Sequence, residues 1–187
     1  LEGSLTSGTK TLTANKVYYL TGGYTVKSGA TLKIEAGVTV IAKNDNIVDY
    51  ILIEQGGKID AQGTASSPIV MTSEKKEAGA WGGIHICGYA HTNLGATSKS
   101  EIGDATYGGT NDADNSGTLR YIRLEYTDYA FSEEKEANGV SFYGVGNGTT
   151  VEYLQAYKGS DDGFEFFGGS VNVKYLVATS CSDDSFD

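Results

Sequence analysis

Three segments near the C-terminal end of this sequence repeat a single pattern. They are 138–143 (NGVSFY), 162–167 (DGFEFF) and 184–187 (DSFD), and they begin 24 and then 22 positions apart. A repeat of this length is typical of one coil of a solenoid, in which equivalent residues of successive coils stack at the inter-strand distance of about 4.8 Å. The sequence therefore predicts a stack of similar coils.

Composition and turn chemistry favour strands over helices throughout the chain. Among 187 residues there are 26 glycines, 13 tyrosines and a single proline. Short alternating segments in the first third end at glycine pairs such as Gly22-Gly23 and Gly56-Gly57, which suit turns with positive φ. Two-residue hairpin signals are scarce, so these turns suit the corners of parallel coils better than a sandwich. We expect an all-β solenoid that forms a single domain over residues 5–187.

Several segments carry a resemblance to a known architecture. They are 25–40 (TVKSGATLKIEAGVTV), 53–64 (IEQGGKIDAQGT), 67–73 (SPIVMTS), 81–84 (WGGI) and 160–169 (SDDGFEFFGG). As a set they resemble right-handed parallel β-helix repeat proteins of bacterial cell surfaces, in particular uncharacterised lipoproteins of Bacteroidetes envelopes. The resemblance implies secretion, a place on the extracellular side of the cell surface or outer membrane, and a binding or adhesive role. It brings no catalytic motif.

The two ends and one long loop stand apart from the regular repeat. Residues 1–4 (LEGS) are typical of a cloning remnant. The chain stops at Asp187, one residue into the outward row of its third repeat, which predicts a truncated β-helix whose last coil is covered by further coils or by a partner. A long polar insertion spans about residues 91–117 and is a candidate binding loop because of its length.

A second set of aligned strands, 119–124, 151–156 and 173–178, follows the first set. Aligned tyrosines form a ladder at Tyr121, Tyr153 and Tyr175. The positions before them form a column of alternating charge, Arg120, Glu152 and Lys174, which we interpret as register control. Strict alternation would place that column on the same side as the inward Ile122, so either the column lies at a corner or the inward assignment is wrong.

Acidic residues also align between the last two coils. Asp161 aligns with Asp183, Asp162 with Asp184, and Glu165 with Asp187. Stacked carboxylates repel one another unless backbone N–H groups, water or a cation offsets their charge, and hard oxygen ligands at this density favour Ca²⁺ or Mg²⁺. Two interpretations stay open: the aspartates accept hydrogen bonds at coil corners, or they hold a cation such as Ca²⁺.

A second candidate for calcium lies in the insertion. Asp112 and Asp114, followed by Ser116 and Gly117, match the first half of a calcium-binding loop. The twelfth position is Arg123 instead of a bidentate glutamate, so the segment is not an EF-hand. An ordinary polar turn is the alternative interpretation.

Outward-facing aromatic residues beside carboxylates indicate a candidate ligand surface. The candidates are Tyr143, Glu165 and Phe167 on one face, with Tyr126 and Tyr129 after the second strand of a neighbouring coil. Aromatic rings contact the C–H faces of sugars while carboxylates bind hydroxyl groups. An insertion packed over these positions would bury them and end this hypothesis.

Catalysis is the alternative, because many β-helix proteins cleave polysaccharides. The carboxylates of Asp161, Asp162, Asp183 and Asp184 would serve as acid and base or nucleophile at separations of about 5 to 9.5 Å. The chain lacks the other motifs of the β-helix hydrolases and lyases, and no Ser-His-Asp or Cys-His set is evident.

The net charge of −10 argues against nucleic acid as the partner, because such partners reward clustered Lys and Arg. No apolar run approaches the roughly 20 residues of a membrane span. We therefore expect a non-catalytic cell-surface module that binds a glycan or a protein and is stabilised by Ca²⁺. A polysaccharide hydrolase or lyase and a passive structural stalk are the alternatives.

Overall fold

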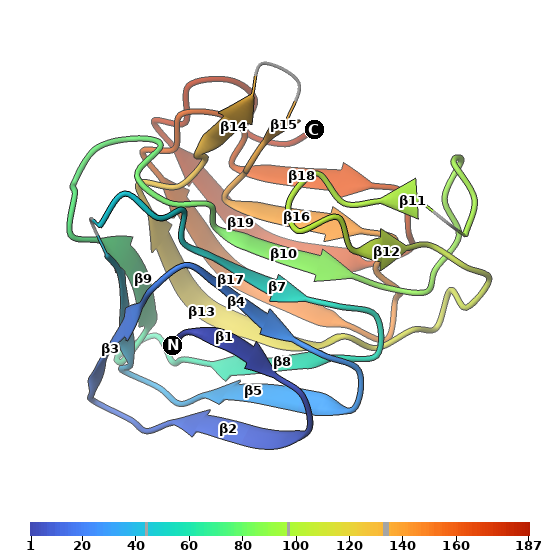
Figure 1. Ribbon diagram of the computed structural model, residues 1–187, viewed down its shortest axis with the longest axis horizontal. Helices are drawn as coiled ribbons and strands as arrows, with labels where there is room; N and C mark the ends of the chain where they lie inside the picture. Colours follow the sequence, from blue (N-terminus) through green and yellow to red (C-terminus); the bar gives the residue numbers. More distant parts are fainter. Residues whose placement is uncertain (44, 97, 133–134) are drawn as a thin grey trace.

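A computed structural model describes residues 1–43, 45–96, 98–132 and 135–187 of the chain, and the described residues form strands without any helix. Six strands make one parallel sheet, which we call the first sheet. In spatial order they are β1 (Gly3–Leu5), β4 (Gly23–Val26), β7 (Tyr50–Ile53), β10 (Ile84–Cys87), β16 (Val140–Tyr143) and β18 (Phe164–Phe167). Each strand belongs to a successive coil of the chain (Figure 1).

The remaining long strands complete the other two faces of the coil. β2 (Gly8–Leu12), β5 (Ala30–Ile34) and β8 (Lys58–Gln62) build the second face, while β3 (Val17–Leu20), β6 (Thr39–Ala42) and β9 (Ile69–Ser73) build the third. From the fourth coil on, one long strand covers both faces. These strands are β13 (Gly117–Glu125), β17 (Thr150–Tyr157) and β19 (Asn172–Thr179).

Parallel pairing and a continuous axial core confirm the predicted parallel β-helix. The register predicted from the repeat is present, since Val140 pairs with Phe164 and Phe142 with Phe166. The rings of Phe142 and Phe166 stack with centroids 5.0 Å apart, and those of Phe164 and Phe186 are 5.6 Å apart. Inward aliphatic side chains of all three faces fill the interior. The described residues include no helix long or apolar enough to cross a membrane.

The tyrosine ladder marks the corner between the second and third faces. Tyr121, Tyr153 and Tyr175 have φ values of 49°, 59° and 57°, a left-handed conformation that turns the strand without ending it. Leu119, before this corner, and Ile122, after it, are both buried. The inward assignment of Ile122 is therefore correct, because the corner residue breaks the alternation that would have placed Arg120 inside.

Placing tyrosine at this corner is costly. A left-handed conformation costs a non-glycine residue roughly 1–2 kcal/mol, whereas an aromatic pair contributes about 0.5–1.5 kcal/mol beyond its buried area. The three rings stack in two pairs with centroids 4.4 and 4.5 Å apart. Stacking thus offsets only part of the backbone strain, and Asn or Gly would turn the chain at lower cost.

Two insertions interrupt the regular coils. The segment after β10 contains the antiparallel pair β11 (Ser98–Lys99) and β12 (Thr106–Tyr107), which lies beside the first sheet (Figure 1). A second antiparallel pair, β14 (Ala130–Ser132) and β15 (Lys135–Glu136), precedes β16. The predicted insertion at 91–117 is therefore not a structureless loop.

The first residues take part in the fold. Gly3 and Ser4 pair with Tyr24 and Thr25 in the first sheet, and Leu1 packs against the core. The origin of residues 1–4 stays a prediction, but they lie within the β-helix.

Replacing a corner glycine tests the close stacking of coils. Gly83 has φ 67°, and a Cβ there would collide with the carbonyl oxygen of Asn138 in the next coil. Gly29 has φ 79° with nothing within 4 Å of its Cβ position, so it is a matched control. We expect Gly29→Ala to lower the free energy of unfolding by about 1–2 kcal/mol and Gly83→Ala to lower it by clearly more. Urea denaturation measures both, and equal losses would contradict the stacking.

Candidate functional site

The insertion after β10 covers the outer face of the first sheet. Tyr143 is completely buried in a small apolar cluster with Leu52, Cys87, Ala105 and Tyr107. Its ring lies 5.1 Å from that of Tyr107 and stacks 4.4 Å from that of Phe167. The expectation that Tyr143 is an exposed sugar platform is therefore wrong, because the insertion supplies the side chains that bury it.

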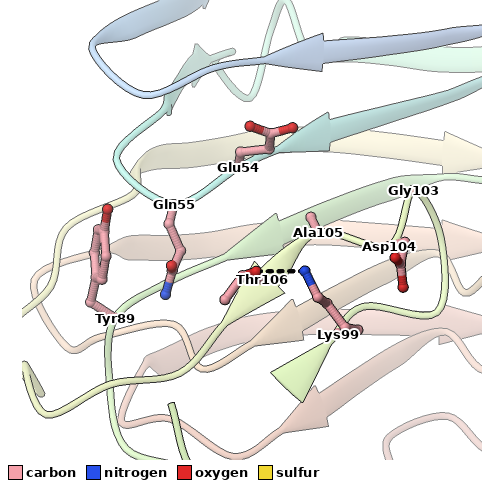
Figure 2. A pocket seen from close by; sticks show the side chains of 8 residues that line it. All are labelled: Glu54, Gln55, Tyr89, Lys99, Gly103, Asp104, Ala105 and Thr106. Carbon is pink, nitrogen blue, oxygen red and sulfur yellow. Dashed lines mark hydrogen bonds between the residues drawn. The ribbon is translucent and has the colours of Figure 1, made fainter. Parts of the chain in front are cut away.

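A polar pocket of about 380 Å³ opens where the insertion meets the coils (Figure 2). Its lining comes from three parts of the chain: the corner after β7, Tyr89 two residues after the end of β10, and the β11–β12 hairpin. The residues are Glu54, Gln55, Tyr89, Lys99, Gly103, Asp104, Ala105 and Thr106. Figure 2 shows Tyr89 and Gln55 on one side of the pocket and Lys99 and Asp104 on the other.

Hydrogen bonds hold the insertion against the coils at this pocket. The Gln55 side-chain amide donates to the carbonyl oxygens of Gly88 and Gly108, at 2.8 and 2.9 Å, so one side chain ties together both flanks of the insertion. Lys99 Nζ donates to Thr106 Oγ1 at 2.8 Å across the hairpin, and this bond is drawn in Figure 2. The walls are thus fixed by the fold before any ligand enters.

The pocket offers an aromatic ring beside groups of both charges. Tyr89 is 38% exposed, Glu54 is ion-paired with Lys27, and Lys99 and Asp104 are exposed. Such a set can contact an apolar ring face and exchange hydrogen bonds with several hydroxyl groups.

The other residues predicted to bind a ligand do not join this pocket. Tyr126 packs against Tyr157, with centroids 6.2 Å apart, and under the ammonium of Lys76 at 5.5 Å. Tyr129, 36% exposed, lines a separate pocket of about 220 Å³ that includes Ile47. The structure therefore does not bring the five predicted aromatic and acidic residues into one site.

The acidic residues of the last two coils do come together. Single carboxylate oxygens of Asp161, Asp162 and Asp183 lie within 4.8 Å of one another, and so do those of Asp162, Glu165 and Asp187. We call these five residues the acid cluster. Asp162 belongs to both groups and is almost fully buried.

Burial and mutual repulsion raise the pKa values of Asp161, Asp162 and Glu165 in the acid cluster. Burial, and then the charges of Glu136 and Asp162, raise the pKa of Asp161 to about 7. Burial, and then the charges of Glu101 and Asp162, raise the pKa of Glu165 to about 8. Burial likewise raises the pKa of the neighbouring Asp128 to about 8. Several of these carboxyl groups therefore keep their protons near neutral pH.

Backbone N–H groups offset part of the negative charge in and beside the acid cluster. Asp162 Oδ1 accepts from the N–H of Asp184 at 2.8 Å, and Asp128 Oδ2 accepts from the N–H of Asp161 at 3.2 Å. The corner role predicted for these aspartates is therefore present at Asp162. Asp184 contributes its backbone to this corner, and its side chain lies outside both groups of clustered oxygens found among the described residues.

The half-matched calcium loop forms a structural turn. Asp112 Oδ1 accepts from the backbone N–H of His91 at 3.1 Å and lies 2.6 Å from His91 Nδ1. Asp114 Oδ2 accepts from the hydroxyl of Ser116 at 3.2 Å. Neither aspartate belongs to a group of three potential metal ligands in the described residues.

One comparison with known proteins gives a match. The family model described as a pectate-lyase-like beta helix domain matches residues 3–187. The chain belongs to this family. No curated protein and no solved structure matches it. Membership in the pectate-lyase-like β-helix family suggests a carbohydrate-related role, and the choice between binding and cleavage then depends on the site.

Sequence reasoning missed the pocket of this pectate-lyase-like domain. The length of the insertion was a valid signal, since β11 and β12 supply one wall. Glu54 and Gln55 gave no such signal, because their sequence is typical of an ordinary coil corner. They contact the insertion only because the coils stack.

The acid cluster predicts an unusual dependence of stability on pH. A carboxyl group whose pKa is raised in the folded state binds its proton more tightly there than in the unfolded chain, so its contribution is full at low pH and lost as pH rises through the folded pKa. From the values for Asp161 and Glu165, we expect the free energy of unfolding in chelator to fall between pH 5 and pH 8.

Glu165→Gln should flatten this decline, because it removes one titrating group. The exposed Glu77→Gln is the control and should leave the slope unchanged. Urea denaturation at a series of pH values measures the slope, and a stability that rises steadily from pH 5 to pH 8 would refute the assignment.

Proposed function

We propose that this β-helix is a non-catalytic carbohydrate-binding module whose binding site is the pocket between the insertion and the coils. The observation that supports it most directly is the lining itself, with Tyr89 on one side of the pocket and Lys99 and Asp104 on the other. A volume of about 380 Å³ falls in the range of small-ligand sites. The family match is consistent with a carbohydrate ligand.

A sugar ring would use these groups in a simple way. The C–H face of the ring packs on Tyr89, while Lys99 donates to hydroxyl oxygens and Asp104 accepts from hydroxyl groups. Glu54 keeps an acceptor at the rim while paired with Lys27. No bond is broken in this arrangement.

Substitutions in the pocket test the proposal. Tyr89→Ala and Lys99→Ala should each weaken binding of the best oligosaccharide from a glycan array at least tenfold, a loss of about 1.4 kcal/mol, because each removes a contact without opening the core. Tyr129→Ala, at the separate small pocket, is the control and should bind normally. Isothermal titration calorimetry measures the affinities. An array without binders, together with capture of a protein ligand, would favour protein adhesion instead.

Hydrolysis or lysis by Asp161, Asp162, Asp183 and Asp184 is the second candidate. The raised pKa values of Asp161 and Asp162 favour it, since a general acid must hold a proton at neutral pH. Oxygens that lie within 4.8 Å leave little room for the water that inverting cleavage places between carboxylates about 6.5–9.5 Å apart. Release of reducing ends that disappears in Asp162→Asn would establish cleavage and overturn a purely binding role.

We also propose that the acid cluster binds Ca²⁺ and that the cation stabilises the last coils. Two overlapping groups of carboxylates support this, as does Asp128, which is buried beside them with Oδ1 lacking a hydrogen-bond partner. At pH 8, millimolar Ca²⁺ should raise the melting temperature relative to chelator, and Asp162→Asn should abolish most of the rise. Asp112→Asn is the matched control and should keep the rise. A wild-type melting temperature that Ca²⁺ does not change would contradict the proposed metal site.

The cellular setting is proposed from the sequence resemblance alone. A module of this kind would act on the extracellular side of a bacterial surface, where glycans and surface proteins are accessible. A passive stalk would show none of these binding activities.

A further inference from the structure

A second surface of the molecule, beside the tyrosine ladder, forms an open apolar groove of about 420 Å³. It follows the corner between the second and third faces across the last three coils. Along each long strand, a corner tyrosine is followed by one inward residue and one outward residue. The lining is Tyr121, Tyr153 and Tyr175, then Ile122 and Leu154, then Arg123, Gln155 and Val177, with Pro68 as a further member.

The ladder presents a regular row of hydroxyl groups along this groove. Its rings stack almost parallel, with interplanar angles of 5° and 21°, so their faces meet each other and their edges border the solvent. Tyr153 is 37% exposed and Tyr175 is 61% exposed. One phenol per coil therefore repeats at close to the strand spacing.

The corner conformation points to a role beyond turning the chain. All three tyrosines have positive φ, a strained state for a bulky residue that persists where surrounding structure or function requires it. Three successive coils retain a tyrosine where asparagine or glycine would relieve that strain. What the tyrosines add is the row of aromatic hydroxyl groups.

Charges beside the groove are nearly balanced. Arg123 Nε lies 2.8 Å from Glu125 Oε1, and its guanidinium lies 4.8 Å from the centre of the Tyr157 ring. Arg120 is ion-paired with Glu152, which also faces Lys174 in register. In a chain with a net charge of −10, this surface carries neither a strong acidic nor a strong basic field. Its charge therefore complements a neutral polar ligand.

We propose that this groove binds a neutral, extended polysaccharide that lies parallel to the β-helix axis, with about one sugar ring per coil. The C–H faces of the rings would pack over the exposed side chain of Val177 and the exposed edges of the tyrosine rings, above the buried Ile122 and Leu154. On one rim, hydroxyl groups of the sugar would form hydrogen bonds with the row of tyrosine hydroxyl groups. On the other rim, they would form hydrogen bonds with Arg123 and Gln155. The proposal rests on the carbohydrate role argued above, but it concerns a different surface from the insertion pocket.

Affinity electrophoresis in gels containing soluble neutral xylan tests the groove directly. The wild-type protein should be retarded, and Tyr121→Asn with Tyr153→Asn should lower the association constant at least tenfold. Asparagine tolerates the left-handed conformation, so the corners should keep their shape, which circular dichroism and thermal melting check. Tyr153→Phe keeps the stack and removes one hydroxyl, so it should give a smaller loss.

The pocket variant Tyr89→Ala separates the two proposals. It should keep full retardation by xylan, while the ladder variant should keep its affinity for the small sugar bound in the pocket. Absence of retardation, equal retardation of the ladder variant, or stronger retardation by polygalacturonate than by xylan would each overturn the groove proposal. Sedimentation that shows a dimer for the wild-type protein and a monomer for the ladder variant would also overturn it. A second copy of the chain would then occupy the groove.

Discussion

Stacking of equivalent residues, coil on coil at the strand spacing, is the constraint on which the rest of this structure depends. It places Phe142 on Phe166 in the core and brings the Cβ position of Gly83 against the backbone of the next coil. It also aligns the three corner tyrosines ring on ring. Because equivalent positions stack, a favourable residue type repeated in successive coils gives a column of favourable contacts. A repeated residue type that repels itself gives a column of unfavourable contacts.

In the acid cluster, stacking brings carboxylates of like charge close together. Single carboxylate oxygens of Asp161, Asp162 and Asp183 lie within 4.8 Å of one another, a distance at which like charges repel. Burial, and then the neighbouring carboxylates, raise the pKa values of Asp161 and Asp162, and the N–H of Asp184 offsets only part of this effect at Asp162. The proposed carbohydrate-binding role therefore rests on the insertion pocket, and the acid cluster is proposed to hold a cation.

The sequence predicted the features that repeat and missed those that do not. Register, core columns and the tyrosine ladder followed from aligned positions. The pairing of Val140 with Phe164 and the stacked tyrosine rings confirmed them. The burial of Tyr143 was missed because Tyr107 and Ala105 reach it from an insertion that has no counterpart in other coils. The pocket was not predicted for the same physical reason. Glu54, Tyr89 and Lys99 come together only when the insertion folds back onto the coils. The left-handed corner at Tyr121 was not foreseen either, because positive φ is rare for tyrosine.

We propose that sugar binds between the insertion and the coils and not at the acid cluster. A crystal structure with the preferred oligosaccharide from the array is the most direct measurement of it. We expect a sugar ring on Tyr89 with hydroxyl groups near Lys99 and Asp104. A sugar bound across Asp161 and Asp162, with the pocket filled only by solvent, would contradict it.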